Sequence, residues 1–426
     1  MKNLTRWKDY QNKSYRSYTL FILSFAYCLN GIDRNILNIL QEPIKNEFGL
    51  SDTHLGLLSG VSFAIFYSFF GLPIARWADR GTRTNIIAIA ITLWSLMTAI
   101  SGFAQSYLHL LLARIGVAVG ESGASPPAHS MISDIYPPEF RATALSLYSI
   151  GITVGMLAGF VLGGWINDMF GWRMAFVIVG LPGILLAILI YFTISEPQRE
   201  RAQSSEDDRA SETFHSVLRF LFSKQSLVLI CIASGAQAAS GYAFVSWLAP
   251  YFIRTFDFST SEAGLYVGLV LGIFGAFGVF MGGWLTDRLR SRSLGWYCWG
   301  PALASLIIIP AAVIGFLSEN AFISMMLFWV PGMLIGFYLP ASIAAMHNTV
   351  PPSMRATISA ILFFIINLVG LGLGPLMVGI LNDFLVGELS VDYLGDSILM
   401  VMLIFQTLAC CLFFFAGKKL IVDTPT

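Results

Sequence analysis

The chain has 426 residues, of which 56% are apolar and only 12% are charged, and its mean hydropathy is +0.71. Soluble domains carry about 25% charged residues, so this composition excludes an ordinary soluble globule, and an aromatic content of 14% excludes a disordered chain. The 25 basic and 25 acidic residues cancel, so no net charge points to a nucleic-acid partner.

Twelve segments are predominantly apolar over the ~20 residues that a membrane-spanning helix needs. In chain order they cover residues 18–40, 53–75, 84–104, 107–133, 140–164, 173–194, 225–253, 262–284, 296–317, 321–346, 354–381 and 397–417. The sequence therefore predicts an all-α membrane protein with twelve transmembrane helices.

Basic residues are distributed unevenly between the connections that join these segments. If the N-terminus is cytoplasmic, 20 of the 25 lysines and arginines lie on the cytoplasmic side, and the outer loops hold only Lys45, Arg173 and Arg254. Because cytoplasmic loops are enriched in lysine and arginine, we predict that both termini are cytoplasmic. The short loops favour a bacterial inner membrane.

One connection differs from the others in length and composition. Residues 195–224 are charged and poor in apolar side chains, and they lie halfway along the chain. We expect a cytoplasmic linker there, between a six-helix bundle over 18–194 and a second one over 225–417. Residues 1–17 and 418–426 are expected to be cytoplasmic tails.

The second half of the chain repeats the first. FGLSDTHLGLLSG at 48–60 aligns with FDFSTSEAGLYVG at 256–268, and YPPEFRATALS at 136–146 aligns with VPPSMRATISA at 350–360. Since each repeat holds an even number of spans, both bundles should have the same orientation and be related by an axis along the membrane normal. Two similar bundles around a central cavity suit transport by alternating access.

Motifs in the first half resemble those of the major facilitator superfamily. The end of the second span and the connection after it, ARWADRGTRT, fit that superfamily's pattern through Gly71 in the span and through Asp79, Arg80, Gly81 and Arg83 in the connection. The fifth span resembles its glycine-rich segment through Gly151, Gly155, Gly159 and Gly163. The resemblance covers essentially the whole chain and implies two pseudo-symmetric six-helix bundles that work as a secondary transporter.

A narrower resemblance is to the spinster-like lipid transporters. The first span contains GIDRNILNIL, with the Asp-Arg pair of that group, and the fourth span carries Arg114 followed by Gly120-Glu121, which also match. This resemblance implies a lysophospholipid or a sphingolipid-like substrate such as sphingosine-1-phosphate, together with proton coupling.

Four charged residues lie inside predicted spans of the first half: Asp33, Arg34, Arg114 and Glu121. The interiors of the second half's spans contain none. Such charges are costly in hydrocarbon and are functional by default. At a rise of about 1.5 Å per residue, Asp33 and Arg114 both lie roughly 10 Å below the outer surface, and Glu121 follows Arg114 on nearly the same helix face. We expect Asp33, Arg114 and Glu121 to line one wall of a cavity.

Two interpretations of these charges are open. They form either a structural ion-pair network that fixes helix packing or a proton-coupling site. Burial disfavours the charged form of a carboxyl group, and a nearby arginine favours it. Moving the arginine or bringing up an anionic substrate would therefore change the acid from its ionised to its protonated form. We hypothesise that Asp33 and Glu121 carry protons. Arg34 and Arg114 would hold either these two acids or the substrate's anionic head.

The stretch after Glu121 offers a further titratable group. His129 could relay a proton near neutral pH, or it could be a hydrogen-bonded residue at a helix end. Pro126-Pro127 should kink or interrupt the fourth span just before it.

Polar and aromatic residues on several spans are candidates for lining a substrate cavity, because the first, fourth, seventh and tenth helices usually line the centre in the superfamily. They are Asn30, Asn38, Tyr148, Gln237, Tyr242, Tyr338 and Asn367. Each could equally make a helix-packing hydrogen bond. A charged wall in the first half and an apolar, Phe-rich second half suit an amphiphile.

Charged residues on the cytoplasmic side, related by the repeat, form a candidate gate. They are Arg76, Asp79, Arg80, Arg83, Arg141, Asp287, Arg288 and Arg355. Pseudo-symmetry predicts that Asp79 approaches the helix start near Arg355 and that Asp287 approaches the helix start near Arg141, where the helix dipole favours an acid. Alternatively, these charges only fix the topology.

The sequence contains no G-x-x-x-x-G-K-[ST] loop, no serine-centred catalytic elbow and no metal-ligand spacing of Cys and His. We therefore predict a monomeric proton-coupled transporter that is not an enzyme and uses no cofactor. Its partners would be membrane lipids, protons and an amphiphilic anion such as a lysophospholipid, with no nucleic acid. The alternatives are a transporter of a small carboxylate or sugar acid and, more weakly, a lipid-modifying enzyme or a substrate sensor.

Overall fold

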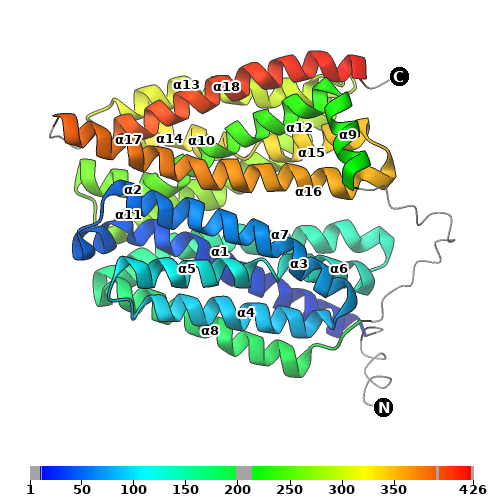
Figure 1. Ribbon diagram of the computed structural model, residues 1–426, viewed down its shortest axis with the longest axis horizontal. Coiled ribbons are helices and arrows are strands. Elements are labelled where there is room, and N and C mark those ends of the chain that lie inside the picture. Colours follow the sequence, from blue (N-terminus) through cyan, green and yellow to red (C-terminus); the bar gives the residue numbers. More distant parts are fainter. Residues whose placement is uncertain (1–9, 11, 198–213, 390–392, 424–426) are drawn as a thin grey trace. The chain divides into compact units, whose positions relative to one another are not determined.

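The computed structural model describes residues 10, 12–197, 214–389 and 393–423. Most of the predicted N-terminal tail, residues 198–213 of the predicted linker and the end of the C-terminal tail lie outside the described residues. Within the described residues, all twelve predicted spans are helical (Figure 1).

The first half of the chain is built from nine helical elements. They are α1 (Lys13–Phe48), α2 (Asp52–Gly56), the π-helix η2 (Leu57–Val61), α3 (Ser62–Arg80), α4 (Arg83–Ser101), α5 (Tyr107–Glu121), α6 (Ser125–Ile135), α7 (Pro138–Phe170) and α8 (Trp172–Thr193). This count refers to the part of the half that the structure describes.

The second half follows the same order after one additional helix, α9 (Phe214–Ser223). The remaining elements are α10 (Gln225–Phe256), α11 (Thr260–Gly268), the π-helix η4 (Leu269–Phe274), α12 (Gly275–Leu289), α13 (Trp296–Phe316), α14 (Ala321–Leu334), α15 (Tyr338–Thr349), the 3₁₀-helix η5 (Pro352–Met354), α16 (Arg355–Ile365), the π-helix η6 (Ile366–Leu373), α17 (Gly374–Leu389) and α18 (Leu394–Asp423).

Ten helices of the described residues are long and apolar enough to cross a membrane. The other two predicted spans are α1 and the pair α5–α6, which carry the four charged residues of the first half. Helix α1 is also longer than the predicted 18–40. The Asn12 side chain accepts a hydrogen bond from the Ser14 amide at its start, and Gly49 ends it in the left-handed region at φ 62°.

The described C-terminal part of the expected linker differs from a solvated connection. Residues 214–223 form α9, and Val217 and Leu221 are buried in an apolar core cluster with residues of α10, α15, α16 and α18. Phe214, Val217 and Leu221 recur at helical spacing, so an amphipathic helix was present in the sequence beside the charged run.

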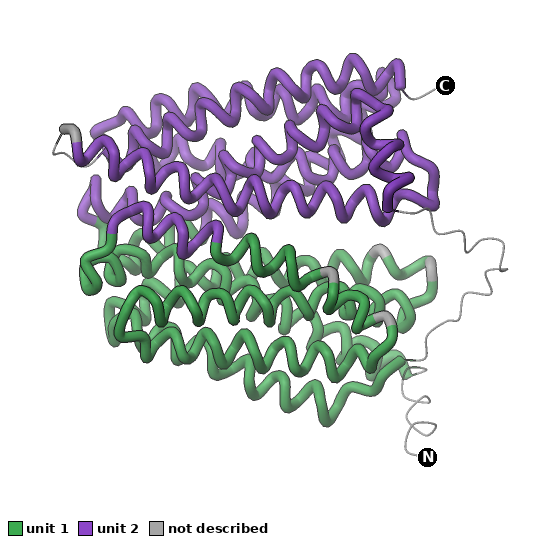
Figure 2. The backbone as a smooth tube through the Cα atoms, viewed as in Figure 1, with its two compact units in different colours: residues 1–50, 62–202, 258–268 green, residues 51–61, 203–257, 269–426 purple. Residues whose placement is uncertain are grey.

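The chain divides into two compact units (Figure 2). Unit 1 contains residues 1–50, 62–202 and 258–268, and unit 2 contains 51–61, 203–257 and 269–426. Each unit thus includes a short segment from the other half of the chain: α2 and η2 belong to unit 2, and α11 belongs to unit 1. In both cases the segment meets the rest of its span at one end of a π-helix, a feature that often marks a hinge or a functional site.

In unit 1, α1 packs closely along α7. A Cβ atom added to Gly155 would overlap the Cys28 carbonyl oxygen, and one added to Gly151 would overlap the Ser24 carbonyl oxygen. Small residues at four-residue spacing let membrane helices approach to backbone contact. This packing fixes the part of α1 that precedes Asp33 and Arg34.

Candidate functional site

The four charged residues predicted from the sequence lie together in unit 1. Arg34 on α1 donates from Nε to Glu121 Oε2 on α5 at 2.6 Å. Arg114 precedes Glu121 on nearly the same face of α5. Its guanidinium donates to the backbone carbonyl oxygens of Asp33 at 3.2 Å and Arg34 at 3.3 Å. Asp33, Arg114 and Glu121 are buried, whereas the Arg34 side chain is 25% exposed. The direct ion pair is thus Arg34–Glu121, and Arg114 binds the backbone of α1.

Aromatic rings of α3 cover the two arginines. The Phe63 ring lies 4.6 Å from the Arg114 guanidinium carbon and 5.1 Å from that of Arg34, and the Tyr67 ring lies 4.7 Å from that of Arg34. Such cation–π contacts hold a guanidinium without neutralising its charge. Phe63 and Tyr67 were not among the residues predicted from the sequence, although their spacing of four residues places them on one helix face.

Local sequence explains why Glu121 is buried at a helix end. Helix α5 stops at Glu121, residues 122–124 form a turn, and α6 begins with Pro126 and Pro127 in its first turn. Proline is favoured at that position because the first turn of a helix does not use its amide donors. A Cβ on Gly120 would lie 2.7 Å from the Trp94 amide nitrogen, so α5 approaches α4 closely here. Thr98 of α4 interacts with Asp33 from the same side.

Three buried atoms of the charge cluster have no hydrogen-bond partner among the described residues: Asp33 Oδ1, Arg114 Nε and Glu121 Oε1. Buried polar groups are normally paired, and an exception calls for an explanation. The cluster holds two carboxyl groups and two guanidinium groups, so it is neutral when both acids are ionised. The Asp33 Oδ1 and Glu121 Oε1 atoms can therefore accept a proton, and Arg114 Nε can donate to a ligand, while Glu121 Oε2 still accepts from Arg34.

Two of the predicted cavity residues lie near this cluster. Asn30 is buried on α1 and interacts with Glu121. Tyr148 of α7 is buried, stacks on Tyr27 at 4.6 Å and contacts the His129 ring at 5.1 Å. Asn30, Tyr27 and Tyr148 also line a small cavity next to the cluster. Asn38 is buried further along α1.

The remaining cavity candidates belong to unit 2. Gln237 accepts a hydrogen bond from Ser305 at 2.8 Å, and the Asn367 amide donates to the Phe363 carbonyl of its own helix at 2.8 Å. Tyr338 lies in the apolar core cluster, against which Tyr242 also packs. The structure therefore gives Gln237 a hydrogen bond between α10 and α13, gives Asn367 a bond to the preceding helical turn, and gives the two tyrosines packing contacts.

Of the residues predicted for the cytoplasmic gate, Arg83 has the most contacts. It is buried and forms ion pairs with Asp134 of α6 at 2.5 Å and Glu196 at 2.7 Å. Glu196 also accepts a hydrogen bond from the Thr84 amide at 3.0 Å. Neither acid was among the residues predicted from the sequence, although both lie in or beside the basic-rich segments that were predicted to be cytoplasmic.

The other gate residues have local contacts. Arg141 donates to the Tyr136 carbonyl at 2.9 Å, and Arg355 donates to the His347 carbonyl at 3.1 Å, so the repeat-related pair makes the same kind of bond. Asp287 accepts from the Tyr297 hydroxyl at 3.1 Å, and Arg288 lies 5.5 Å from the Trp284 ring. Arg76 and Arg80 are exposed. The Asp79 side chain lies outside what the structure describes, and its predicted approach to Arg355 stays a prediction, as does that of Asp287 to Arg141.

Two Asn-Asp pairs at equivalent places in the two halves, Asn167-Asp168 and Asn382-Asp383, each cap a helix in their own unit. In unit 2, Asp383 accepts hydrogen bonds from the amides of Asp52 and Thr53 at 2.9 and 2.8 Å. In unit 1, Asp168 accepts one from the Ser261 amide at 2.8 Å. A carboxylate at a helix N-terminus binds free amides and is favoured by the helix dipole.

The cap in unit 2 has an additional charge pair. Arg254 binds Asp52 through two hydrogen bonds of 2.9 and 2.7 Å, and the Asn382 amide donates to Asp52 at 2.6 Å. At the equivalent position in unit 1, the uncharged Thr260 hydroxyl accepts a hydrogen bond from the Asn167 amide at 3.0 Å. The alignment of the repeats places Asp52 opposite Thr260. The sequence therefore already showed an acid at this position in one repeat and an uncharged residue in the other.

Comparison with known proteins identifies relatives that span the chain. The family pattern described as Major Facilitator Superfamily matches residues 23–375. A solved structure described as a bacterial homologue of the human lysosomal transporter Spinster, in an inward-facing and unoccupied conformation, is 32% identical. It superposes with a TM-score of 0.89 and covers 97% of this chain and 99% of its own.

Curated relatives have different cargoes. An MFS-type efflux pump of Mycolicibacterium smegmatis is 32% identical over 93% of this chain and 92% of its own length. The cis,cis-muconate transport protein of Acinetobacter baylyi is 25% identical over 79% and 81%. The sphingosine-1-phosphate transporter SPNS2 of Danio rerio is 26% identical over 85% and 75%.

Proposed function

Because this chain belongs to the major facilitator superfamily, it is an integral membrane transporter and not an enzyme, and we propose that it couples protons to the movement of an amphiphilic anion. The proposed cargo is a lysophospholipid or a sphingolipid-like phosphate, moved by alternating access. We place the protein in a bacterial inner membrane with both termini cytoplasmic.

The observation that supports this proposal best is the charge balance of the buried cluster in unit 1. Two acids and two arginines share a site in which Glu121 is 1% exposed and Asp33 is 3% exposed. An uncompensated charge is costly at membrane depth. One proton bound to either carboxyl group leaves the cluster with a net charge of +1, and a bound anionic head restores neutrality. Proton and anion are therefore favoured together.

The ion-pair geometry indicates how each residue contributes. Protonation of Glu121 would weaken its bond with Arg34, the most exposed of the four side chains, and free that guanidinium for a phosphate or carboxylate. Arg114, held by two α1 carbonyls and by the Phe63 ring, supplies a fixed positive charge beside Asp33. Asn30 and Tyr148 would contribute polar contacts around the head group.

The amphiphilic class of cargo is favoured by the relatives named for spinster and for sphingosine-1-phosphate. The apolar side chains of the second half would accommodate the hydrocarbon part, with Gln237, Tyr242, Tyr338 and Asn367 as its polar and aromatic contacts. The charged connections, including Asp79, Arg141, Asp287 and Arg355, would close the cytoplasmic side during the cycle.

A second candidate is a transporter of a small organic anion. It is favoured by the relative that transports cis,cis-muconate, a dicarboxylate. The same two arginines would then bind a carboxylate, and no apolar chain would be accommodated.

Flux measurements in proteoliposomes test the proposal. We expect uptake of lysophosphatidylglycerol or sphingosine-1-phosphate to rise when a pH gradient is imposed, and the variants Asp33→Asn and Glu121→Gln to lose this acceleration while still exchanging substrate without a gradient. Glu47→Gln, which alters an acid that is 42% exposed, serves as the matched control. Unchanged coupling in both cluster variants contradicts the proton site, and transport of muconate but no lipid selects the second candidate.

A further inference from the structure

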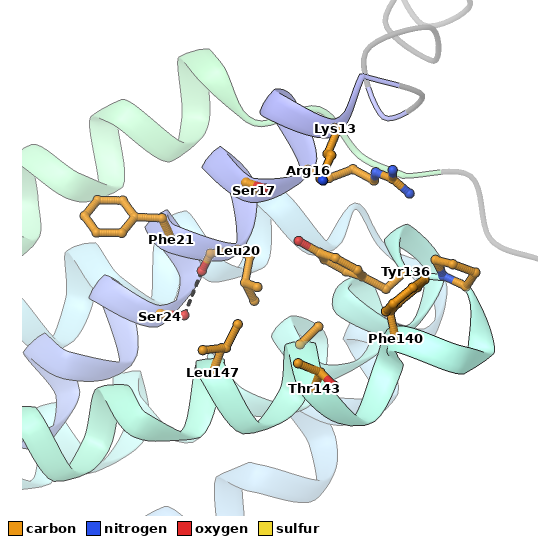
Figure 3. Close-up of a pocket in the computed structure, with 12 residues that line it drawn as sticks. Lys13, Arg16, Ser17, Leu20, Phe21, Ser24, Tyr136, Phe140, Thr143 and Leu147 are labelled. Atoms are coloured by element: carbon orange, nitrogen blue, oxygen red, sulfur yellow. Dashed lines mark hydrogen bonds between the residues drawn. The ribbon is translucent and has the colours of Figure 1, made fainter.

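A cavity of about 760 Å³ lies in unit 1 at the start of α1, away from the charge cluster (Figure 3). It is formed on one side by residues 13–24 of α1 and on the other by residues 136–147, which lead into and begin α7. Its volume lies within the range of about 300–1,000 Å³ that is typical of small-molecule sites. None of its lining residues belongs to the charge cluster.

The chemistry of the lining changes from one end to the other. Lys13 and Arg16 lie at the end nearest the start of α1, and the Tyr136 ring lies 6.0 Å from the Arg16 guanidinium carbon. No acidic residue occurs among the described residues that line the cavity. The two cations therefore face this space without a lining carboxylate to balance them.

The rest of the lining is mostly apolar, with the hydroxyl residues Ser17, Ser24 and Thr143 among it, and it is largely open. Phe21, Phe140 and Leu147 are 66%, 61% and 50% exposed, and Leu20 is buried beneath them. The Ser24 hydroxyl, which also lines the cavity, is bonded to the Leu20 carbonyl at 2.8 Å, so it is satisfied by its own helix. A ligand that fits has an anionic group at one end and a hydrocarbon chain at the other.

We propose that this cavity binds an anionic phospholipid of the cytoplasmic leaflet, with its phosphate at Lys13 and Arg16 and an acyl chain along Phe21, Phe140 and Leu147. The predicted topology places the start of α1 at the cytoplasmic surface, where anionic lipids are concentrated and attract basic residues. Tyrosines are enriched at this depth, and burial raises the pKa of Tyr136, which keeps its phenol a neutral donor.

Charge complementarity distinguishes this occupant from a zwitterionic lipid and from a free anion. Two cations without a lining acid favour a net negative head group, and the exposed apolar half favours a chain that free phosphate lacks. The bound lipid would join the first turn of α1 to the connection between α6 and α7, and it would stay bound during the transport cycle as a structural ligand.

Equilibrium binding of a fluorescent phosphatidylglycerol to the purified full-length chain in detergent tests the site. Each basic residue near an anionic lipid contributes about fivefold to binding, so Lys13→Ala/Arg16→Ala should weaken binding about 30-fold. Lys418→Ala/Lys419→Ala removes two exposed basic residues from the end of α18 and should leave binding unchanged. The charge-preserving exchange Lys13→Arg/Arg16→Lys should bind as the parent does, which separates loss of charge from loss of folding.

Competition and a second variant define the occupant. Unlabelled phosphatidylglycerol should displace the probe, whereas phosphatidylcholine and inorganic phosphate should not, and Leu147→Trp should weaken binding by filling the chain path. Equal competition by phosphatidylcholine, displacement by phosphate alone, or full binding by Lys13→Ala/Arg16→Ala overturns the proposal. Because the readout is binding and not flux, it is independent of the cargo.

Discussion

Replacing Arg254 with methionine removes the cation that balances the buried carboxylate of Asp52 in unit 2. The two side chains are 11% and 2% exposed, and the pair is bidentate. Removing one partner of a buried pair costs about 3–5 kcal/mol, because the other charge stays buried without compensation. The Asn382 amide still donates to Asp52 in the variant but brings no positive charge.

Thermal unfolding in detergent measures this cost. At about 2–4 °C of Tm per kcal/mol for a unit of roughly 150–250 residues, Arg254→Met should lower Tm by about 6–20 °C. Arg173→Met is the matched control, since its ion pair with Glu47 is 38% and 42% exposed. Exposed pairs contribute about 0.2–1 kcal/mol, so the control should lower Tm by only about 4 °C or less.

A double variant completes the test. Asp52→Asn/Arg254→Met removes both charges and keeps an oxygen for the Asn382 amide, so it should recover most of the loss. The reasoning is refuted if the double variant is no more stable than Arg254→Met, or if Arg173→Met costs as much as Arg254→Met. The coupling energy from the cycle then gives the contribution of the pair itself.

Two further changes test packing and charge in unit 1. Gly155→Ala should sharply reduce the yield of folded, monodisperse protein, because the added Cβ would overlap a carbonyl oxygen of α1. Gly71→Ala is the control and should leave the yield unchanged, since a Cβ there meets nothing within 4 Å. Equal yields of the two variants would contradict the α1–α7 contact. Arg83→Met should lower the free energy of unfolding by about 3–5 kcal/mol in a thermal unfolding measurement, because Asp134 and Glu196 lose their buried partner. Replacing the exposed Arg76 with methionine should lower it by less than about 0.5 kcal/mol. A similar Tm for both variants would refute the network.

The positions of the spans could be predicted because apolar length is a local property. The interruption after Glu121 was also predictable, because Pro126-Pro127 lack amide donors for the preceding turn and favour the start of a new helix. The helix ends were less accessible: α1 runs from Lys13 to Phe48 because Asn12 and Gly49 cap it, whereas hydropathy alone indicated 18–40.

Side-chain pairing was harder to predict than proximity. Charges isolated in hydrocarbon indicated that Asp33, Arg34, Arg114 and Glu121 lie together. Depth alone could not show that Glu121 pairs with Arg34 while Arg114 binds backbone carbonyls, because that choice depends on rotamers and on the Phe63 ring. Arg83 illustrates the same limit, since its partner Glu196 is 113 residues away in the chain.

The exchange of short segments between the two units has a consequence for how this protein can be divided. A polypeptide ending in the central connection would supply unit 1 without residues 258–268, which pack against α7, and its complement would supply unit 2 without residues 51–61, which pack against α17. Separately synthesised halves should therefore be unstable alone and recover when produced in the same cell, as fragments that complement each other.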